Sequence, residues 1–218
     1  MKLNALEFQL MNNPLRRLVQ EYYEMRRFLA MDASVEAGKV LEIGCGSGNG
    51  TRLIRKYLRP ERIDAIDLDA RMIEIARRNN VNASISFSVM DATKLEFQND
   101  SFDAVFDFGM IHHVPNWRDC VNEVCRVLRP GGVFMAEELS AESFRNLPGR
   151  LGKALLDHPY EEMFSREQFM EQLMVSGFTI LKAVDANPLG LFKHFALEAR
   201  KNNKAPRRIH ARKGTTNR

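Results

Sequence analysis

The chain has few cysteines and no long hydrophobic run, and both shortages exclude classes of protein. Its 218 residues contain three cysteines, Cys45, Cys120 and Cys125, an odd number without Cys-x-x-Cys spacing. This pattern argues against a disulfide framework and a zinc site, so we expect free thiols and no bound metal. No apolar run approaches the roughly 18–20 residues of a membrane span. The N-terminus lacks the pattern of a secretory signal, which predicts a cytoplasmic protein.

The chain also lacks acidic residues at its C-terminal end. The formal net charge is +4, from 32 Lys and Arg against 28 Asp and Glu, yet residues 200–218 hold eight Lys or Arg and no acid. The remaining residues therefore carry 24 basic and 28 acidic side chains, a net charge of −4. Such an asymmetry can mark a contact with nucleic acid or a peripheral contact with a membrane. The simpler interpretation is a solvated, disordered tail, and we expect no stable nucleic-acid complex.

What the chain does have is a glycine-rich turn directly after a short apolar segment. Residues 40–48 read Val-Leu-Glu-Ile-Gly-Cys-Gly-Ser-Gly. Glycine at alternate positions allows positive φ and lets a ligand approach the backbone closely. The next apolar residues recur at helical spacing, so the free N–H groups of a helix N-terminus point at the turn. This arrangement predicts a site for a nucleotide-type ligand.

The spacing of the glycines indicates which ligand. The dinucleotide fingerprint Gly-x-Gly-x-x-Gly fails in both registers, because its third glycine is replaced by Asn49 or Thr51. The phosphate-binding loop pattern fails as well, because no Gly-Lys pair follows the turn. The pattern that remains, Glu-x-Gly-x-Gly-x-Gly over residues 42–48, resembles the first motif of the class I S-adenosylmethionine-dependent methyltransferases.

Four further motifs follow in the order and spacing of that family, and together they are far more specific than the turn alone. They are a segment ending at Asp67, a segment ending at Asp91 and Ala92, residues 99–106, and residues 110–115 with 126–134. The resemblance covers residues 38–139 closely. The resemblance implies S-adenosylmethionine as cofactor. Within the family, the sequence is similar to the broad small-molecule branch that includes ubiquinone- and menaquinone-biosynthesis methyltransferases.

Predicted strands and helices alternate from residue 39 to residue 138. Alternation implies parallel strands joined by right-handed crossovers, with helices on both faces of the sheet. We therefore expect an α/β fold, a Rossmann-like doubly wound seven-stranded sheet that is mostly parallel. The resemblance implies that the last strand is antiparallel. Ser165 with Gln168 predicts a capping box at the start of a late helix, and Gly177 predicts its end.

The predicted domain organisation has three parts. Residues 1–36 form an N-terminal helical cap, in which a helix from Pro14 to Ala30 lies over the cofactor mouth or, alternatively, packs on the sheet. Residues 37–200 form the cofactor-binding Rossmann-like domain, with an insertion at 140–164 that shapes the substrate pocket in the family. Residues 201–218 form the basic tail.

The ends of the predicted strands indicate the cofactor-binding residues, because ligands of open parallel sheets lie beyond the carboxyl ends of the strands. A carboxylate accepts two hydrogen bonds at once, so Asp67 suits a ribose diol. Asp91 and the Ala92 N–H are expected at the adenine, while Glu42 binds the cofactor's ammonium group or braces the turn. The complete predicted set is Glu42, Gly44, Cys45, Gly46, Gly48, Asp67, Leu68, Asp91, Ala92, Phe108 and Gly109.

The sequence defines the catalytic groups less sharply than the cofactor site. Methyl transfer from a sulfonium is an in-line displacement, in which the protein mainly aligns the reactants and excludes water. His112 and His113 are the candidate bases, since an imidazole could deprotonate a phenol, enol or amine; packing is the alternative role. Glu137 and Glu138 follow the fifth strand, where alternation lets one of them point inward.

The expected activity is methyl transfer from S-adenosylmethionine to a small-molecule or amphiphilic, lipid-like acceptor. One alternative is a nucleic-acid or protein methyltransferase tethered by the basic tail. The other is a non-catalytic subunit that binds the cofactor or a partner. The motifs do not define the acceptor atom or the oligomeric state.

Overall fold

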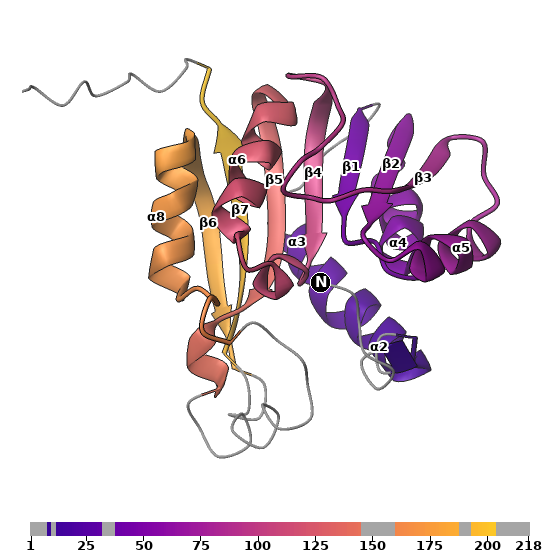
Figure 1. Cartoon of the computed structure of the whole chain (residues 1–218), viewed down its shortest axis with the longest axis horizontal. Helices are drawn as coiled ribbons and strands as arrows, with labels where there is room; N and C mark the ends of the chain where they lie inside the picture. Colours follow the sequence, from indigo (N-terminus) through magenta and orange to yellow (C-terminus); the bar gives the residue numbers. More distant parts are fainter. Residues whose placement is uncertain (1–7, 10–11, 32–37, 145–159, 188–192, 204–218) are drawn as a thin grey trace, which may run out of the picture.

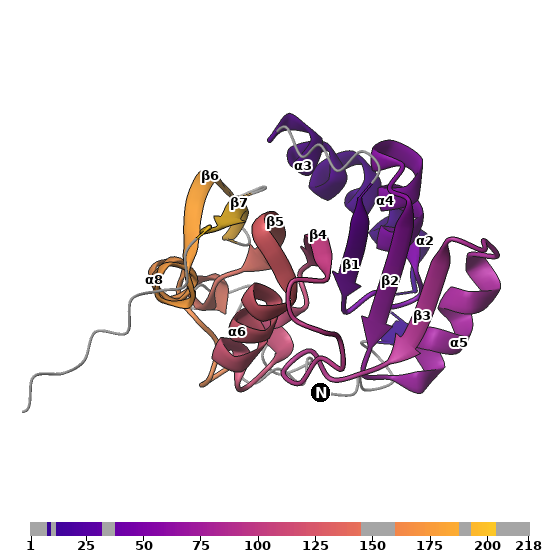
Figure 2. The same ribbon diagram turned by 90° about the horizontal axis from the view of Figure 1, so that it is seen from above.

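A computed structural model describes residues 8–9, 12–31, 38–144, 160–187 and 193–203. Seven strands form one sheet in the order β3-β2-β1-β4-β5-β7-β6, with helices on both faces (Figures 1 and 2). The strands are β1 Lys39–Ile43, β2 Arg62–Asp67, β3 Ile85–Val89, β4 Phe102–Phe108, β5 Leu128–Leu139, β6 Phe178–Ala186 and β7 His194–Lys201. The main helices of the domain are α4 Asn49–Leu58, α5 Ala70–Asn79, α6 Trp117–Val127 and α8 Arg166–Ser176.

The pairing of the strands confirms the predicted fold class. Strands β1 to β5 pair with one another only in parallel. Strand β7 pairs antiparallel with both β5 and β6, from Val133 opposite Arg200 to Leu139 opposite His194 in the first case. Parallel strands place their carboxyl ends at one edge of the sheet, and that edge carries the candidate site.

Alternating side chains along the strands build a core on each face of the sheet. Leu41 and Ile43 of β1 belong to the larger cluster, which α6 and α8 cover. Val40 packs on the opposite face with Leu53 and Ile54 of α4. A strand that is buried on both faces reads as a continuous apolar run, which is why the first strand was visible in the sequence.

The predicted capping box is confirmed at the start of α8. The Ser165 N–H donates to Gln168 Oε1 at 2.9 Å, and the Gln168 N–H donates to Ser165 Oγ at 3.2 Å. Gly177 ends the helix with φ +104°, a left-handed conformation that costs glycine little. The cap and the terminating glycine together define the helix that covers β5 to β7.

The predicted N-terminal helix forms as three consecutive segments: α2 Pro14–Val19, the π-helical turn η1 Gln20–Met25, and α3 Arg26–Ala30. The π-helical turn was not predicted. The orientation is also unexpected, because the helix buries Gln20 and Glu24 along with Met25 and Phe28. Most of its apolar stripe faces solvent. The spacing of apolar residues identified this helix, but it did not indicate which side faces the protein.

Several sequence predictions lie partly or wholly outside the described residues. These are the centre of the insertion at 140–164 and nearly all of the tail, since residues 145–159 and 204–218 are not described.

The three cysteines are buried and free, as expected. Within the described ranges, no helix is both long and apolar enough to cross a membrane.

Candidate cofactor and active site

A cavity lies where the carboxyl ends of β1 to β4 meet the start of α4 and the N-terminal helix. Ten of the predicted site residues line it: Gly44, Cys45, Gly46, Asp67, Leu68, Asp91, Ala92, Phe108, Gly109 and His113. Glu42, Gly48 and His112 are not among the lining residues, and Glu42 and His112 are buried. The fold thus brings segments from five parts of the sequence to one cavity, in agreement with the strand-end argument.

Each of the three positions in the turn requires glycine for a different structural reason. All three adopt positive φ, +64° at Gly44, +52° at Gly46 and +82° at Gly48. A Cβ on Gly44 would overlap the side chain of Met110, and a Cβ on Gly48 would overlap that of Asn80, whereas a Cβ on Gly46 would meet no atom within 4 Å. Gly46 therefore presents bare backbone to the cavity, which suits close approach of a cofactor.

Asp67 joins the turn to the end of β2. Its Oδ2 accepts from the Gly46 N–H at 2.9 Å, and its Oδ1 accepts from the Asp69 N–H at 2.8 Å. Burial raises the pKa of Asp67, while these two donors lower it. Each oxygen keeps a further lone pair, so the carboxylate can brace the turn and still accept from a ligand. Asp69 instead caps α5, where it accepts from the Arg71 N–H.

We expect Asp67→Ala to lower cofactor affinity about ten- to a hundredfold, because hydrogen bonds to a charged group are worth about 1.5–3 kcal/mol each before water replaces them. Isothermal titration calorimetry measures the change. Asp67→Asn, which keeps one acceptor oxygen, is expected to lose less. An unchanged dissociation constant for Asp67→Ala would limit Asp67 to bracing the turn.

Asp91 forms a tight local turn at the cavity wall. Its Oδ1 accepts from both the N–H and the hydroxyl of Thr93 at 2.8 Å. These contacts satisfy one carboxylate oxygen. The role of Asp91 at the adenine stays a prediction, and the local turn is compatible with it.

Glu42 lies beneath the turn. It is buried and accepts a hydrogen bond from the Thr51 hydroxyl, and burial raises its pKa to about 8. Of the two roles expected for Glu42, this placement favours bracing the turn. A direct contact with the cofactor would need a path through the cavity wall.

Two buried acids position the histidines. His112 Nδ1 lies 2.6 Å from Glu138 Oε2, and the Ile111 N–H donates to Glu138 Oε1 at 2.7 Å. The Met110 N–H donates to Asp107 Oδ1 at 2.8 Å. Burial raises the pKa of Asp107 well above its usual range, and that of Glu138 to about 7. Together the two carboxyl groups hold η2 Ile111–His113 against the ends of β4 and β5.

The two candidate bases therefore have different places. His112 is 8% exposed and contacts Glu138, whereas His113 lines the cavity. Their ring centroids are 4.2 Å apart. Of the two candidate bases only His113 lines the cavity, so the predicted role as a base remains a prediction for His113, with His112 beside it.

The N-terminal helix contributes cavity residues that sequence reasoning missed. Arg16, Arg17 and Gln20 line the cavity. Gln20 Oε1 accepts from Asn49 Nδ2 at 2.7 Å, which ties the helix to the start of α4. Arg16 donates to Glu24 at 2.7 Å and to the Phe108 carbonyl at 3.3 Å. The spacing of four between Arg16, Gln20 and Glu24 could have indicated a polar face turned toward the protein. The apolar stripe on the other side of the helix was the stronger pattern in the sequence.

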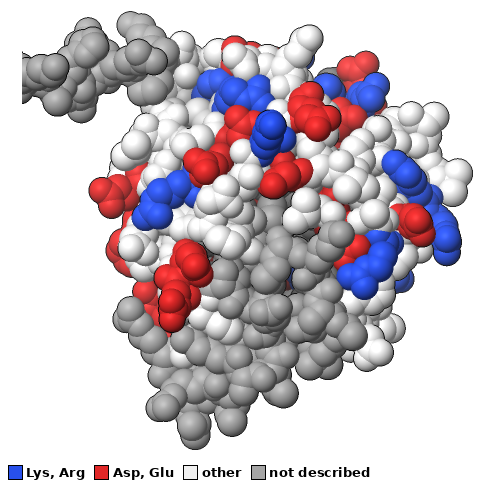
Figure 3. Space-filling model, viewed as in Figure 1, with Lys and Arg blue, Asp and Glu red and all other residues white. Residues whose placement is uncertain are grey.

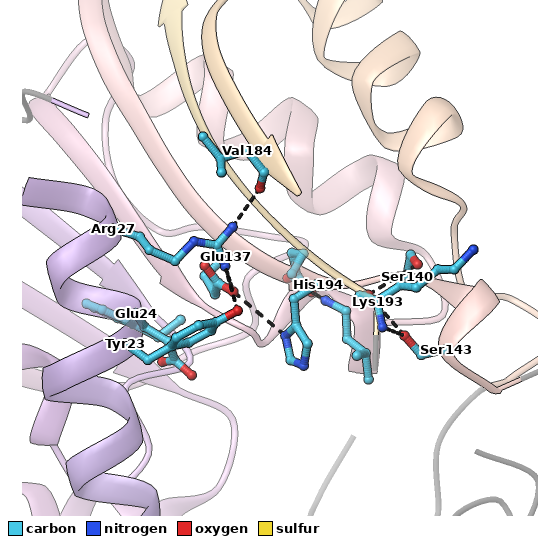
Figure 4. Close-up of polar contacts among 12 residues, drawn as sticks. Tyr23, Glu24, Arg27, Glu137, Ser140, Ser143, Val184, Lys193 and His194 are labelled. Atoms are coloured by element: carbon cyan, nitrogen blue, oxygen red, sulfur yellow. Dashed lines mark hydrogen bonds and ion pairs between the residues drawn. The ribbon is translucent and has the colours of Figure 1, made fainter. Parts of the chain in front are cut away.

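A buried polar cluster anchors this helix to the sheet (Figure 4). Arg27 donates to Glu137 Oε1 and to the Val184 carbonyl, both at 2.6 Å. His194 Nδ1 lies 3.7 Å from the same Glu137 oxygen, on the side opposite Tyr23. Burial raises the pKa of Glu137 to about 8 and lowers that of His194 to about 4. Glu137 and Glu138 are thus both buried, on opposite faces of β5, and neither lines the cavity.

No group of three or more His, Cys, Asp or Glu in the described part of the chain is arranged to hold a metal ion. The polar groups at the cavity include the carboxylates of Asp67, Asp69 and Asp91, the imidazole of His113, backbone amides, and the side chains of Arg16, Arg17 and Gln20. The carboxylates can accept from hydroxyl, amine and ring N–H groups, and the open face of Gly46 provides space beside them.

The chain is similar in sequence to known methyltransferases. Residues 41–136 match the family described as Methyltransferase domain. The chain is 35% identical to a fatty-acid O-methyltransferase of Mycolicibacterium smegmatis over 137 residues, 63% of this chain and 49% of that protein. It is 35% identical to a phthiotriol/phenolphthiotriol dimycocerosates methyltransferase of Mycobacterium tuberculosis over 101 residues, 46% of this chain and 37% of that protein. The chain thus matches half or less of the length of these curated relatives.

A solved structure shows the same fold at low sequence identity. An S-adenosylmethionine-dependent methyltransferase from Mesorhizobium loti superposes with a TM-score of 0.69 and 20% identity, covering 83% of this chain and 97% of that one. The sheet order and the domain match define a class I S-adenosylmethionine-dependent methyltransferase fold. Residues 41–136 thus match the methyltransferase-domain family in sequence, and the fold is shared with a protein described as an S-adenosylmethionine-dependent methyltransferase. The narrower resemblance to the quinone-biosynthesis branch stays a prediction.

Proposed function

We propose that this protein transfers the methyl group of S-adenosylmethionine to an oxygen atom of a small, lipid-like acceptor. The observation that carries the proposal is the cavity, because its walls combine the glycine turn, the carboxylates of Asp67 and Asp91, the Phe108 ring and the His113 imidazole. The names of the two mycobacterial relatives support an amphiphilic acceptor and, for the first, an oxygen nucleophile.

The residues of the chain have separate tasks in this proposal. S-adenosylmethionine supplies an electrophilic methyl group on a sulfonium. Asp67, Asp91 and the turn around Gly46 bind and orient the cofactor, as the sequence motifs predict. Glu138 holds the loop of His113, and the N-terminal helix excludes water from the cavity mouth. Alignment and water exclusion are the main contributions that a methyl transfer requires.

Incubation of the full chain with methyl-labelled S-adenosylmethionine tests the proposal. Acceptors would include a long-chain fatty acid, a hydroxylated lipid and a phenol, with products identified by mass spectrometry. We expect label in an ester or ether of at least one of them. Calorimetry with S-adenosylmethionine and NAD is the companion measurement, and binding of NAD alone would contradict the cofactor assignment.

We expect His113→Ala to reveal the kind of acceptor. A hydroxyl must lose its proton, so removing a general base should lower kcat about a hundredfold or more. A carboxylate acceptor is already ionised near neutral pH, so kcat should then change little. The cofactor dissociation constant, measured in parallel, should stay within about twofold. A large loss of cofactor binding would instead assign His113 to the cofactor site.

The alternative function is methylation of nucleic acid or protein, with the basic tail as tether. Basic and acidic side chains alternate over the face shown in Figure 3, and no extended basic surface is visible there. Lys201 belongs to β7, and its Nζ donates to Asp100 and to the Leu128 carbonyl, both at 2.6 Å. A deletion that tests the tail should therefore start at residue 204.

We expect deletion of residues 204–218 to leave cofactor affinity and turnover of a small acceptor nearly unchanged. The described strands and their hydrogen bonds end before this segment. If the tail instead holds a polyanion, activity on RNA should fall steeply with salt, because phosphate contacts release counterions. Salt-sensitive RNA methylation that disappears on deletion would favour the alternative. The cytoplasmic location remains a prediction.

A further inference from the structure

The N-terminal helix has an inverted amphipathic orientation. Its polar side chains Arg16, Gln20, Glu24 and Arg27 point into the protein, where they pair with each other, with Asn49 and with Glu137. Its apolar side chains face solvent instead: Leu15 is 64% exposed, Leu18 53%, Val19 41%, Tyr22 61% and Leu29 36%. A helix whose apolar stripe faces away from the core offers a surface for another partner.

The helix cannot roll over to bury this stripe without pulling a buried guanidinium away from its acceptors. Arg27 has a side chain that is 14% exposed, and it donates to Glu137 Oε1 of β5 and to the Val184 carbonyl of β6, both at 2.6 Å. Losing both acceptors would leave the Arg27 charge in the interior without compensation. These contacts of Arg27 with Glu137 and Val184, drawn in Figure 4, keep the apolar stripe outside.

The charges beside the stripe are basic. Among residues 12–31, the charged side chains classed as exposed are Arg17 and Arg26. Glu21 is 13% exposed and is paired with Arg52 at 3.1 Å and Lys56 at 2.6 Å, two further basic residues from α4. An apolar stripe with flanking Arg and Lys is the pattern of a helix that lies in the interface of an anionic membrane.

A second copy of the chain fits this surface less well. In a two-fold symmetric dimer built on the stripe, the same patch would meet itself, so the exposed arginines Arg17 and Arg26 of both copies would be gathered at one interface. Like charges brought together across an interface are unfavourable. An anionic lipid surface complements the same arginines.

We propose that the outward stripe of Leu15, Leu18, Val19 and Tyr22 docks the protein on an anionic membrane, with the cavity mouth beside the lipid. The same helix lines the cavity through Arg16, Arg17 and Gln20, so docking would place the mouth where an amphiphilic acceptor is dissolved. The inference extends the proposed function, because it names the source of the lipid-like acceptor.

Co-sedimentation of the full chain with vesicles tests this docking surface. The vesicles contain phosphatidylcholine alone or phosphatidylcholine with phosphatidylglycerol. We expect the protein to bind the anionic vesicles, and the triple variant Leu15→Gln, Leu18→Gln and Tyr22→Gln to partition about tenfold less, because its apolar contact area is lost. Glutamine has good helix propensity, so circular dichroism should show an unchanged fold. Arg26→Gln should lose about fivefold on anionic vesicles only.

The matched control carries the same kind of change on α8. Met174 and Val175 are 59% and 67% exposed, so Met174→Gln with Val175→Gln removes comparable apolar surface away from the cavity mouth. This double variant should bind vesicles like the wild type. Absence of wild-type binding, or equal binding by the triple variant, would overturn the proposal. So would binding that disappears only when residues 204–218 are deleted.

Two further measurements separate this inference from neighbouring ones. Sedimentation velocity without lipid should show the same oligomeric state for wild type and triple variant, and a dimer lost in the variant would assign the stripe to a second copy. Vesicle binding is measured without cofactor or acceptor, so it does not depend on methyl transfer. Turnover of a short, water-soluble acceptor should be equal in both proteins. Turnover without any vesicle binding would reject the docking surface and leave the proposed function intact.

Discussion

Gly50→Ala is expected to destabilise the protein by about 3 kcal/mol or more, because a buried overlap forces neighbouring groups to move. A Cβ at this position in the first turn of α4 would overlap Glu42 Oε1 and lie 2.9 Å from Phe108 Cδ2 and 3.0 Å from Gln20 Nε2. Glu42 is buried and held by the Thr51 hydroxyl, so its carboxyl has little freedom to withdraw. Urea denaturation followed by circular dichroism measures the loss.

Gly46→Ala is the matched control, because it changes a nearby glycine with the opposite surroundings. A Cβ on Gly46 meets no atom within 4 Å, so only the cost of φ +52° should appear, about 1 kcal/mol. The added methyl group would project into the cavity, so cofactor affinity should fall while the fold persists. Equal destabilisation by the two substitutions would contradict the packing argument for Gly50.

The stability of the protein is expected to fall as the pH rises from about 6.5 to about 8. Burial raises the pKa of Glu42 and of Glu137 from 4.5 to about 8. Each group is then protonated in the folded state and ionised in the unfolded state. Stability from such a group is complete below the unfolded pKa and is lost as the pH rises through the folded pKa. The slope is about 1.4 kcal/mol per pH unit for each group.

Other shifted groups act differently in this pH window. Burial raises the pKa of Glu138 to about 7, so Glu138 adds to the fall in stability below that pH. Burial lowers the pKa of His194 to about 4, so His194 is neutral in the folded state throughout, and it is largely neutral in the unfolded state from about pH 7.5 upward. Lys56 and Arg52 hold the pKa of Glu21 at about 2, so Glu21 is ionised in both states throughout. Glu137→Gln should therefore reduce the slope, and Glu21→Gln should leave it unchanged. Equal slopes for wild type and Glu137→Gln, from urea denaturation at several pH values, would show that Glu137 is ionised when folded.

The sequence by itself determined the fold class and the location of the cavity. Both depend on local patterns: alternation of strands and helices restricts the topology, and parallel strands bring their carboxyl ends to one edge. Most of the predicted cofactor residues follow a strand directly, so they line the cavity. Gly44 and Gly46 were recognisable because a tight turn requires positive φ, and that requirement is local.

Only the tertiary structure decided how side chains distant in sequence meet. Gly50 needs to be glycine because Glu42, Phe108 and Gln20 converge on it, and no spacing in the chain encodes that convergence. The apolar period of residues 14–30 identified a helix, but its orientation depends on Glu137, more than a hundred residues away. The buried contacts of Arg27 outweigh the burial of an apolar stripe here, since an unpaired interior charge costs more than exposed apolar surface.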